Sequence, residues 1–271
     1  MNERQANTLV VTLVTVANLL IAFLISGIVI WILGEDPWFA LKTMLYGAFG
    51  YDEGLGYTLY YTTNFIFTGL AFAIGFHCGL FNIGAEGQAY IGGLGVGLVC
   101  LWLENWPLWL VFPLAVLASI ILGGIWGAIP GYLKAKRGSH EVVTTIMFNF
   151  IASVIMVNLL SHVLRPPKEM SPESREFGER VWVPQMHEIF DWFGLEITQT
   201  PLNGTFIFAL LCLLLVWRFI WYTRWGYELR TVGTNETAAV YAGISVSKNI
   251  IIAMVIGGGL AGFVGINEIM G

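Results

Sequence analysis

Long apolar stretches, separated by short polar segments, cover most of the chain. A helix of about 20 apolar residues spans the ~30 Å hydrocarbon core of a bilayer. About seven stretches approach this length, and they cover residues 9–33, 57–76, 85–103, 108–129, 142–164, 205–222 and 250–266. The pattern predicts an all-α fold, a polytopic transmembrane helix bundle of about seven spanning helices with one interrupted helix pair.

Two segments depart from this pattern. Residues 37–51 are apolar but are interrupted by Lys42 and by glycines, so we expect an interfacial or re-entrant helix there. Residues 165–204 are polar and too long for a turn, so we expect a folded loop outside the membrane. We treat residues 1–271 as a single transmembrane domain, because apolar stretches recur along its whole length.

The orientation in the membrane follows from lysines and arginines in the short polar segments. Cytoplasmic loops of membrane proteins carry an excess of both. Such residues gather in 131–141 and in 223–248, as Lys134, Lys136, Arg137, Arg224, Arg230 and Lys248. We therefore expect both segments, and the N-terminus, in the cytoplasm. Residues 165–204 then form an extracytoplasmic loop, and its own basic residues do not reverse this assignment because long loops obey the rule weakly.

The composition supports a membrane protein and excludes several other classes. Hydrophobic residues make up 56% of the chain and charged residues only 11%, which is unlike a soluble domain. The basic residues form no patch for nucleic acid. The three cysteines, Cys78, Cys100 and Cys212, have no metal-binding or redox spacing. We therefore expect a lipid bilayer as the surroundings, no nucleic-acid partner and no metal site.

The chain contains none of the usual catalytic motifs. No P-loop, HExxH or GxSxG motif is present. We therefore expect no enzyme activity and no cofactor in this chain. If nucleotide hydrolysis drives its function, the ATPase is a different polypeptide.

Polar residues interrupt the apolar pattern at the start of the third predicted span, in the stretch GLFNIGAEGQAYIGGLGVG from Gly79. Asn82, Glu86 and Tyr90 recur with a spacing of four and so are expected on one helix face. A stripe of small residues is expected on the neighbouring face: Ala85, Ala89, Gly93 and Gly97. A glutamate at the bilayer centre costs roughly 2.5–3.5 kcal/mol, so it should face protein or a watery cavity. Glu86 either stabilises a buried helix start or contacts a transported solute; we include Asn82, Glu86 and Gln88 in a candidate solute path.

A second polar stripe lies on the fifth predicted span. Ser139 is the expected N-cap of this helix, and four polar residues follow at a spacing of four: Glu141, Thr145, Asn149 and Ser153. The stripe either bonds to neighbouring helices or lines the solute path, so Thr145 and Asn149 join the candidate path. A second stripe of small residues recurs every four positions in the last span: Ala253, Gly257, Ala261 and Gly265. Asn267 and Glu268 near the end of this span receive no role.

The cytoplasmic stretch WGYELRTVGTNETAAVYAGIS predicts a short capped helix. Thr234 or Asn235 serves as its N-cap, Glu236 favours its N-terminal dipole, and Gly243 ends it. Such a helix either fits a groove on a partner protein or lies on the lipid headgroups.

Three segments resemble one protein family: GLFNIGAEGQ from Gly79, GYLKAKRGSHEVVTTIMFN from Gly131, and GYELRTVGTNETAAVYAGISV from Gly226. They are similar to the permease subunits of bacterial ATP-binding-cassette (ABC) importers of the nucleoside type, in the branch that includes ribose and branched-chain amino acid systems. The family more often has asparagine where this chain has His140. Its permeases continue beyond the position of Gly271, so we expect this chain to lack the family's C-terminal helices.

The resemblance implies a permease in the bacterial inner membrane. Its partners would be an ABC ATPase subunit that hydrolyses ATP, a second permease subunit in a homo- or heterodimer, and an extracytoplasmic substrate-binding lipoprotein that delivers nucleosides. The segment from Gly226 would dock on the ATPase, which assigns coupling to Arg230, Gly233, Asn235, Glu236, Ala239, Tyr241 and Gly243. The alternatives are a simple-sugar permease, an ion-coupled secondary transporter that uses Glu86, and a membrane scaffold.

Overall fold

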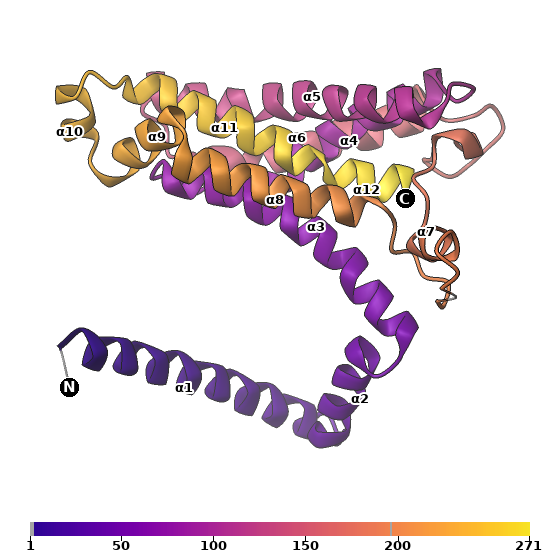
Figure 1. Cartoon of the computed structure of the whole chain (residues 1–271), viewed down its shortest axis with the longest axis horizontal. Helices are drawn as coiled ribbons and strands as arrows, with labels where there is room; N and C mark the ends of the chain where they lie inside the picture. The colour runs from indigo at the N-terminus through magenta and orange to yellow at the C-terminus, as the bar shows by residue number, and fades with distance from the viewer. Residues whose placement is uncertain (1–2, 196) are drawn as a thin grey trace. The chain divides into compact units, whose positions relative to one another are not determined.

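The computed structural model describes residues 3–195 and 197–271. No β-strand forms among these residues, so the prediction of an all-α fold is confirmed. Figure 1 labels the elements, which are α1 (Glu3–Ile32), α2 (Pro37–Phe49), α3 (Asp52–His77), α4 (Ala85–Trp102), α5 (Leu108–Arg137), α6 (Glu141–His162), the 3-10 helix η1 (Glu179–Val181), α7 (Met186–Asp191), α8 (Thr205–Tyr222), α9 (Arg224–Thr234), α10 (Glu236–Tyr241), α11 (Val246–Gly262) and α12 (Val264–Met270).

Six helical segments among the described residues are long and apolar enough to cross a membrane: Val10–Ile32, Asp52–His77, Leu108–Arg137, Glu141–His162, Thr205–Tyr222 and Val246–Met270. They coincide with six of the predicted spans. The stretch predicted at 85–103 does form a helix, α4, but Glu86 and Gln88 make its first turn polar. The predicted number of about seven spans is therefore roughly consistent with the structure.

The contacts divide the chain into two compact units, Met1–Thr58 and Leu59–Gly271. In the first unit, the Asp36 side chain accepts a hydrogen bond from Trp38 N at 2.9 Å and so caps α2. α2 buries none of its side chains. Its 13 residues rise only about 20 Å, less than the hydrocarbon core requires. The interfacial or re-entrant placement of this segment remains a prediction.

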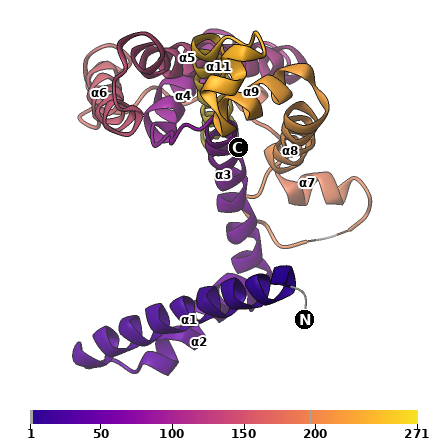
Figure 2. The same cartoon turned by 90° about the vertical axis from the view of Figure 1, so that its left-hand side faces the viewer.

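The second unit has a central layer of three closely packed helices. Figure 2 shows α4, α5 and α11 between α6 on one side and α8 on the other. Glycine permits this packing, because a Cβ on Gly123 of α5 or Gly258 of α11 would collide with the other helix's backbone. The same close approach occurs between Gly92 of α4 and Gly262 of α11.

The two small-residue stripes seen in the sequence meet each other. A Cβ on Gly265 of α12 would collide with Gly93 of α4, and a Cβ on Gly97 would lie 3.8 Å from Ile269 Cδ1. The first stripe thus packs against α12, with α4 and α12 in direct backbone contact. The last apolar run is an interrupted helix pair, since it breaks at Phe263 between α11 and α12.

Aromatic packing holds this interruption in place. The ring of Phe263 lies 5.6 Å from that of Phe67 on α3 and 5.1 Å from that of Phe208 on α8, measured between centroids. Both pairs are edge-to-face, which is a favourable geometry for aromatic rings. α3, α8 and the α11–α12 break therefore form one core.

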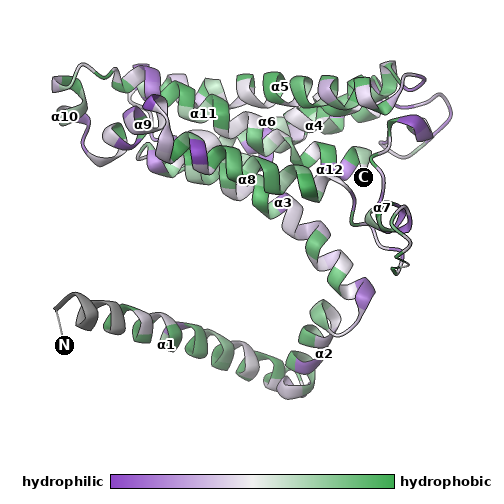
Figure 3. Cartoon of the chain, in the orientation of Figure 1, coloured by the Kyte–Doolittle hydropathy of each residue, from purple (hydrophilic) through white to green (hydrophobic). Residues whose placement is uncertain are grey.

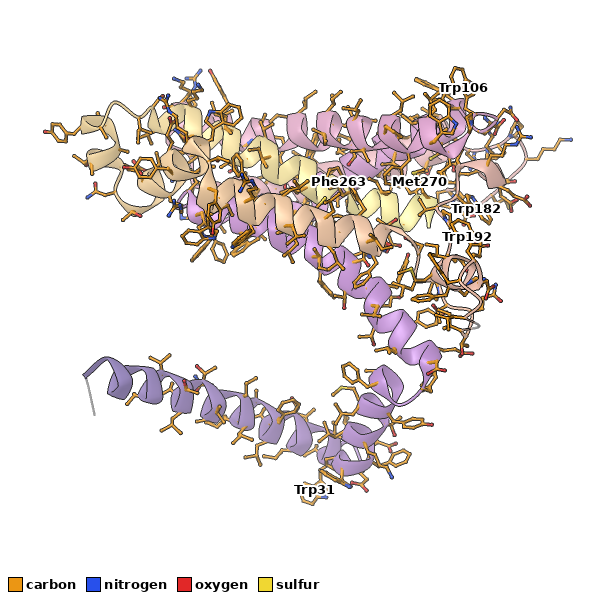
Figure 4. The ribbon with its side chains drawn as sticks, in the orientation of Figure 1. Trp31, Trp106, Trp182, Trp192, Phe263 and Met270 are labelled. Atoms are coloured by element: carbon orange, nitrogen blue, oxygen red, sulfur yellow. The ribbon has the colours of Figure 1, made fainter. Side chains whose placement is uncertain are left out.

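The polar segments of the second unit lie at its two opposite ends. α9 and α10, from residues 223–248, lie at one end, and α7, from residues 165–204, lies at the other (Figure 1); residue 196 lies outside the described residues. Figure 3 shows hydrophobic residues along α5 and α8 between these ends. Exposed tryptophans Trp106, Trp182 and Trp192 gather at the α7 end near Met270 (Figure 4), as expected at a membrane–water interface.

Candidate solute path and coupling surface

The segment before α4 reverses direction at a left-handed glycine. α3 ends at His77, and Gly79 follows it with φ 75°, a conformation that favours glycine at a helix C-terminus. Leu80 N then donates to Gly75 O at 2.9 Å. This turn carries the chain into residues 80–84, which lead to α4.

Two buried amides bind each other across this segment. Asn82 is 2% exposed and Gln88 is 1% exposed. Asn82 Nδ2 donates to Gln88 Oε1 at 3.1 Å, and Gln88 Nε2 donates back to Asn82 Oδ1 at 3.3 Å. Gly84 N also donates to Asn82 Oδ1 at 2.9 Å. Both amides are satisfied inside the protein, so they fix the start of α4.

Asn149 of α6 completes the cap of α4. The residue at the N-cap position, Gly84, has no side chain to accept the first amides of the helix. Asn149 Oδ1 instead accepts a hydrogen bond from Gly87 N at 2.9 Å, and its Nδ2 donates to Ile83 O at 3.0 Å. A side chain distant in sequence therefore performs a function that usually belongs to a local residue.

Thr145 lies one turn before Asn149 and is fully buried. Its hydroxyl donates to Glu141 O at 2.8 Å, and a Cβ on Gly84 would lie 3.1 Å from its Cβ. Thr145 thus packs against the start of α4. The predicted N-cap of α6 at Ser139 is wrong, because His140 occupies the N-cap position and makes no side-chain cap bond.

Glu86 differs from the other candidate path residues. It is exposed, and its Oε1 accepts a hydrogen bond from the Tyr90 hydroxyl at 3.4 Å. Asn82 precedes the helix and points into the protein, so the expectation that it shares a face with Glu86 and Tyr90 is wrong. Asn82, Gln88, Thr145 and Asn149 therefore surround the start of α4, while Glu86 faces outward.

A second polar cluster, which sequence reasoning did not assemble, lies at the α7 end. Asn267 of α12 is 1% exposed. Its Nδ2 donates to Asn64 Oδ1 at 3.0 Å, and its Oδ1 accepts from Asn203 Nδ2 at 3.2 Å. Asn64 Nδ2 in turn donates to Glu268 Oε1. These residues come from three distant segments, so no sequence spacing connects them.

The predicted short helix forms as α10. Asn235 Oδ1 accepts a hydrogen bond from Ala238 N at 3.0 Å, which caps the helix. Gly243 has φ 76° and follows its C-terminus. Ala239 is buried against the rest of the unit, whereas Tyr241 is 90% exposed. Asn235 rather than Thr234 is therefore the cap, and α10 presents an aromatic side chain to its surroundings.

The α9–α10 segment contacts the end of α3 through a pair of glycines. A Cβ on Gly79 would lie 3.2 Å from Gly233 Cα, and one on Gly233 would lie 2.7 Å from Gly79 N. Nearby, the Arg230 guanidinium lies 4.6 Å from the centroid of the Trp221 ring, as a cation–π pair. The other ring contact of Trp221 is with His77 of α3, at 5.8 Å between centroids. α9 is thus connected to the segment that leads to Asn82.

The basic turn between α5 and α6 lies at the same end as α9. Ser247 Oγ of α11 donates to Ala135 O at 3.2 Å. Beside it, Lys134 Nζ forms an ion pair with Glu141 Oε2 at 2.8 Å. Glu141 therefore binds the turn and does not continue the polar stripe toward a solute.

In the part of the chain that the structure describes, no three histidine, cysteine, aspartate or glutamate side chains lie close enough together to hold a metal ion. Cys78, Cys100 and Cys212 are free and buried. They act as small packing residues in the core.

Comparisons with known proteins point to one family. The guanosine ABC transporter permease protein NupP of Bacillus subtilis is 37% identical over 225 residues, which are 83% of this chain and 62% of the relative. The nucleoside ABC transporter permease protein NupB of Lactococcus lactis is 30% identical, over 94% of this chain and 69% of the relative. The glucose ABC transporter permease protein TsgB13 of Haloferax volcanii is 29% identical, over 94% of this chain and 67% of the relative.

This chain therefore spans between 62% and 69% of the length of these relatives. No solved structure matches it. Residues 54–270 match the family described as "Branched-chain amino acid transport system / permease component". Together with the six apolar helices among the described residues, this match shows that the chain is a multi-pass membrane protein and belongs to the branched-chain amino acid transport system permease family.

Proposed function

We propose that the chain is the membrane-spanning permease subunit of an ABC importer, and that it forms a path for nucleosides delivered by an extracytoplasmic binding lipoprotein. The similarity to NupB, over 94% of the chain, carries this proposal. NupP, the relative with the highest identity of the three, is also named for a nucleoside, guanosine. The membrane is then the bacterial inner membrane, and a second permease subunit completes the path.

The orientation places the α9–α10 end in the cytoplasm. Lys134, Lys136 and Arg137 belong to the same end as α9, and this excess of positive charge favours the cytoplasmic side. The α7 end then faces outward, where the binding protein delivers solute. We also propose that the N-terminus lies in the cytoplasm.

α10 is the docking surface for the ATPase. It is short, capped at both ends, and bears the exposed side chains of Val240 and Tyr241. The wider coupling segment includes Arg230, Gly233, Asn235, Glu236, Ala239 and Gly243. ATP is bound and hydrolysed by the partner subunit, so this chain itself is not an enzyme and needs no cofactor.

ATPase movement reaches the solute path through a short chain of contacts. α10 packs on α9, and Gly233 of α9 touches Gly79, which starts the segment that carries Asn82. Asn82, Gln88, Thr145 and Asn149 hold the start of α4, and Glu86 lies on its exposed side. A shift of α9 therefore moves Glu86 relative to the rest of the bundle. The complex then has two conformations, before and after the shift of α9. ATP favours one of them only if it binds more tightly to the ATPase in that conformation.

ATP-dependent uptake of solute tests this function. The intact permease, purified with its associated chains, would be placed in vesicles that contain ATP and given labelled guanosine together with the binding protein. We expect guanosine uptake that stops when ATP is omitted. Uptake without ATP, or the absence of any nucleoside uptake, would contradict the proposal.

Two other functions predict different results in the same assay. A simple-sugar permease is favoured by the similarity to TsgB13, which is named for glucose, and predicts uptake of glucose or ribose in place of guanosine. An ion-coupled transporter is favoured by the exposed Glu86–Tyr90 pair, and predicts uptake that a protonophore abolishes while ATP is irrelevant.

A further inference from the structure

Glu268 is an exposed carboxylate on an otherwise buried helix. Its neighbours Ile266, Asn267 and Met270 on α12 are all buried. Asn64 Nδ2 donates a hydrogen bond to Glu268 Oε1, and the Tyr60 hydroxyl also binds this carboxylate. Both donors come from α3, so the carboxylate is held between α3 and α12.

The support of this carboxylate is rigid. Asn64 Oδ1 accepts from Asn267, which also binds Asn203. Asn203 is fully buried, and its Oδ1 accepts from Thr205 N at 2.9 Å, at the start of α8. Three segments thus fix the position of Asn64, whose side chain fixes Glu268. Such a shell of supporting hydrogen bonds orients a group for binding.

Next to Glu268, α12 contacts α4. Residues 86, 90, 93 and 97 form one stripe on α4, and its glycines Gly93 and Gly97 contact α12 at Gly265 and Ile269. Glu86 therefore borders the α4–α12 contact on the α4 side, and Glu268 borders it on the α12 side. From residue 86 to residue 97 a helix rises roughly 16 Å, so the two carboxylates lie at different depths.

Exposed carboxylates beside one helix contact are unfavourable on a lipid-facing surface, most of all for a residue deep in the membrane. A charged side chain near the bilayer centre costs roughly 2.5–3.5 kcal/mol. Each of these carboxylates also accepts a hydrogen bond from a tyrosine hydroxyl, Tyr90 for Glu86 and Tyr60 for Glu268. Both carboxylates therefore favour contact with water or a polar solute over contact with acyl chains.

We infer that Glu268 is a solute contact at the outer part of the path, where its carboxylate accepts hydrogen bonds from the 2′- and 3′-hydroxyls of a nucleoside's ribose. This inference rests on the proposed function. A carboxylate offers about four acceptor positions, and Asn64 and Tyr60 use two of them. Carboxylates elsewhere bind ribose hydroxyls in this way. Asn64 and Tyr60 are positioning residues, because they hold the carboxylate without touching the solute.

Substitution Glu268→Gln tests the inference with a pair of solutes. Uptake of guanosine would be compared with uptake of 2′,3′-dideoxyguanosine, which lacks the 2′- and 3′-hydroxyls and keeps the 5′-hydroxyl, with each solute saturating the binding protein. Loss of a hydrogen bond to a charged group costs more free energy than loss of a bond between neutral groups. We therefore expect kcat/KM for the guanosine-loaded binding protein to fall roughly tenfold to a hundredfold. Uptake of the dideoxy analogue should change less than twofold, roughly the scatter of such an assay.

Two further variants separate this role from a structural one. Glu53→Gln removes an exposed carboxylate from the first turn of α3 and should leave the uptake of both solutes unchanged. Tyr60→Phe keeps the ring but removes the hydroxyl that positions Glu268, so it should lower guanosine uptake in the same direction by a smaller factor.

The possible outcomes are distinct. If Glu268→Gln lowers the uptake of both solutes equally, or of neither, Glu268 is not a ribose contact, although the proposed function stands. The same conclusion follows if the Gln variant fails to fold and Tyr60→Phe affects both solutes equally. If the unmodified permease takes up no nucleoside, the proposed function fails, and the inference fails with it.

Discussion

Single asparagines each form hydrogen bonds to several polar groups around the candidate path. Asn149 satisfies a backbone amide and a backbone carbonyl at the start of α4, and Asn267 of α12 binds Asn64 of α3 and Asn203, two residues before α8. In a membrane interior, no water replaces a lost partner. Each asparagine is therefore a position where one substitution leaves several polar groups without partners.

Asn149→Ala tests this role directly. The substitution leaves Gly87 N and Ile83 O unsatisfied, and an unsatisfied buried group costs about 1–3 kcal/mol. We expect a lower midpoint of thermal unfolding for the detergent-solubilised protein. Asn158→Ala is the matched control, because Asn158 is an exposed asparagine on the same helix. Equal midpoints for the two variants would show that Asn149 does not support α4.

Pairs of helices in this protein approach so closely that glycine is required at the contacts. α5 and α11 meet at Gly123 and Gly258, and α4 and α12 meet at Gly93 and Gly265. Without a hydrophobic driving force between helices in lipid, close van der Waals packing is what holds such pairs together. Added side-chain volume at these glycine contacts should therefore have the largest effect on the stability of the helix packing.

Gly123→Ala should separate α5 from α11. The new methyl group would collide with the Gly258 carbonyl, and overpacking of this kind costs about 1–3 kcal/mol. Gly69→Ala on α3 provides the comparison, because a Cβ there meets nothing within 4 Å and alanine favours a helix. Thermal unfolding should show a loss of stability for Gly123→Ala and none for Gly69→Ala. A similar midpoint for both would mean that the two helices can move apart at little cost.

At the scale of the whole molecule, the second unit separates its two polar surfaces. α10 lies at one end, and η1, α7 and the exposed tryptophans lie at the other (Figures 1 and 4). In the proposed function, one end binds the ATPase and the other receives the solute. A substitution at either end should therefore affect a different partner.

Tyr241→Ala removes the exposed ring of α10 and should weaken association with the ATPase. Tyrosine is enriched among the few interface residues whose truncation costs about 2 kcal/mol or more, so we expect roughly a tenfold or greater loss of co-purified ATPase. Trp192→Ala removes an exposed aromatic residue at the opposite end and should leave co-purification unchanged. If the Tyr241→Ala variant co-purified as much ATPase as the unmodified permease, α10 would not be the docking surface.

The sequence by itself determined the elements of this protein that depend on local physics. Apolar length defined the spanning helices, since a bilayer imposes one length on every span. Local capping residues defined α10, because Asn235 and Gly243 act within one or two turns of their own helix. Small-residue stripes indicated which helices pack closely. The same local logic failed at Ser139, where the chain begins α6 one residue later than the pattern indicates.

Only the tertiary structure decided which polar residues act together. Spacing placed Asn82 and Glu86 on one face, but the turn at Gly79 directs Asn82 inward and leaves Glu86 outside. Asn64 and Glu268 are 204 residues apart in sequence and share a hydrogen bond. Hydrogen bonds act over about 3 Å, whereas a sequence pattern describes neighbours along one helix. Which polar residues meet between helices can therefore be determined only from the folded bundle.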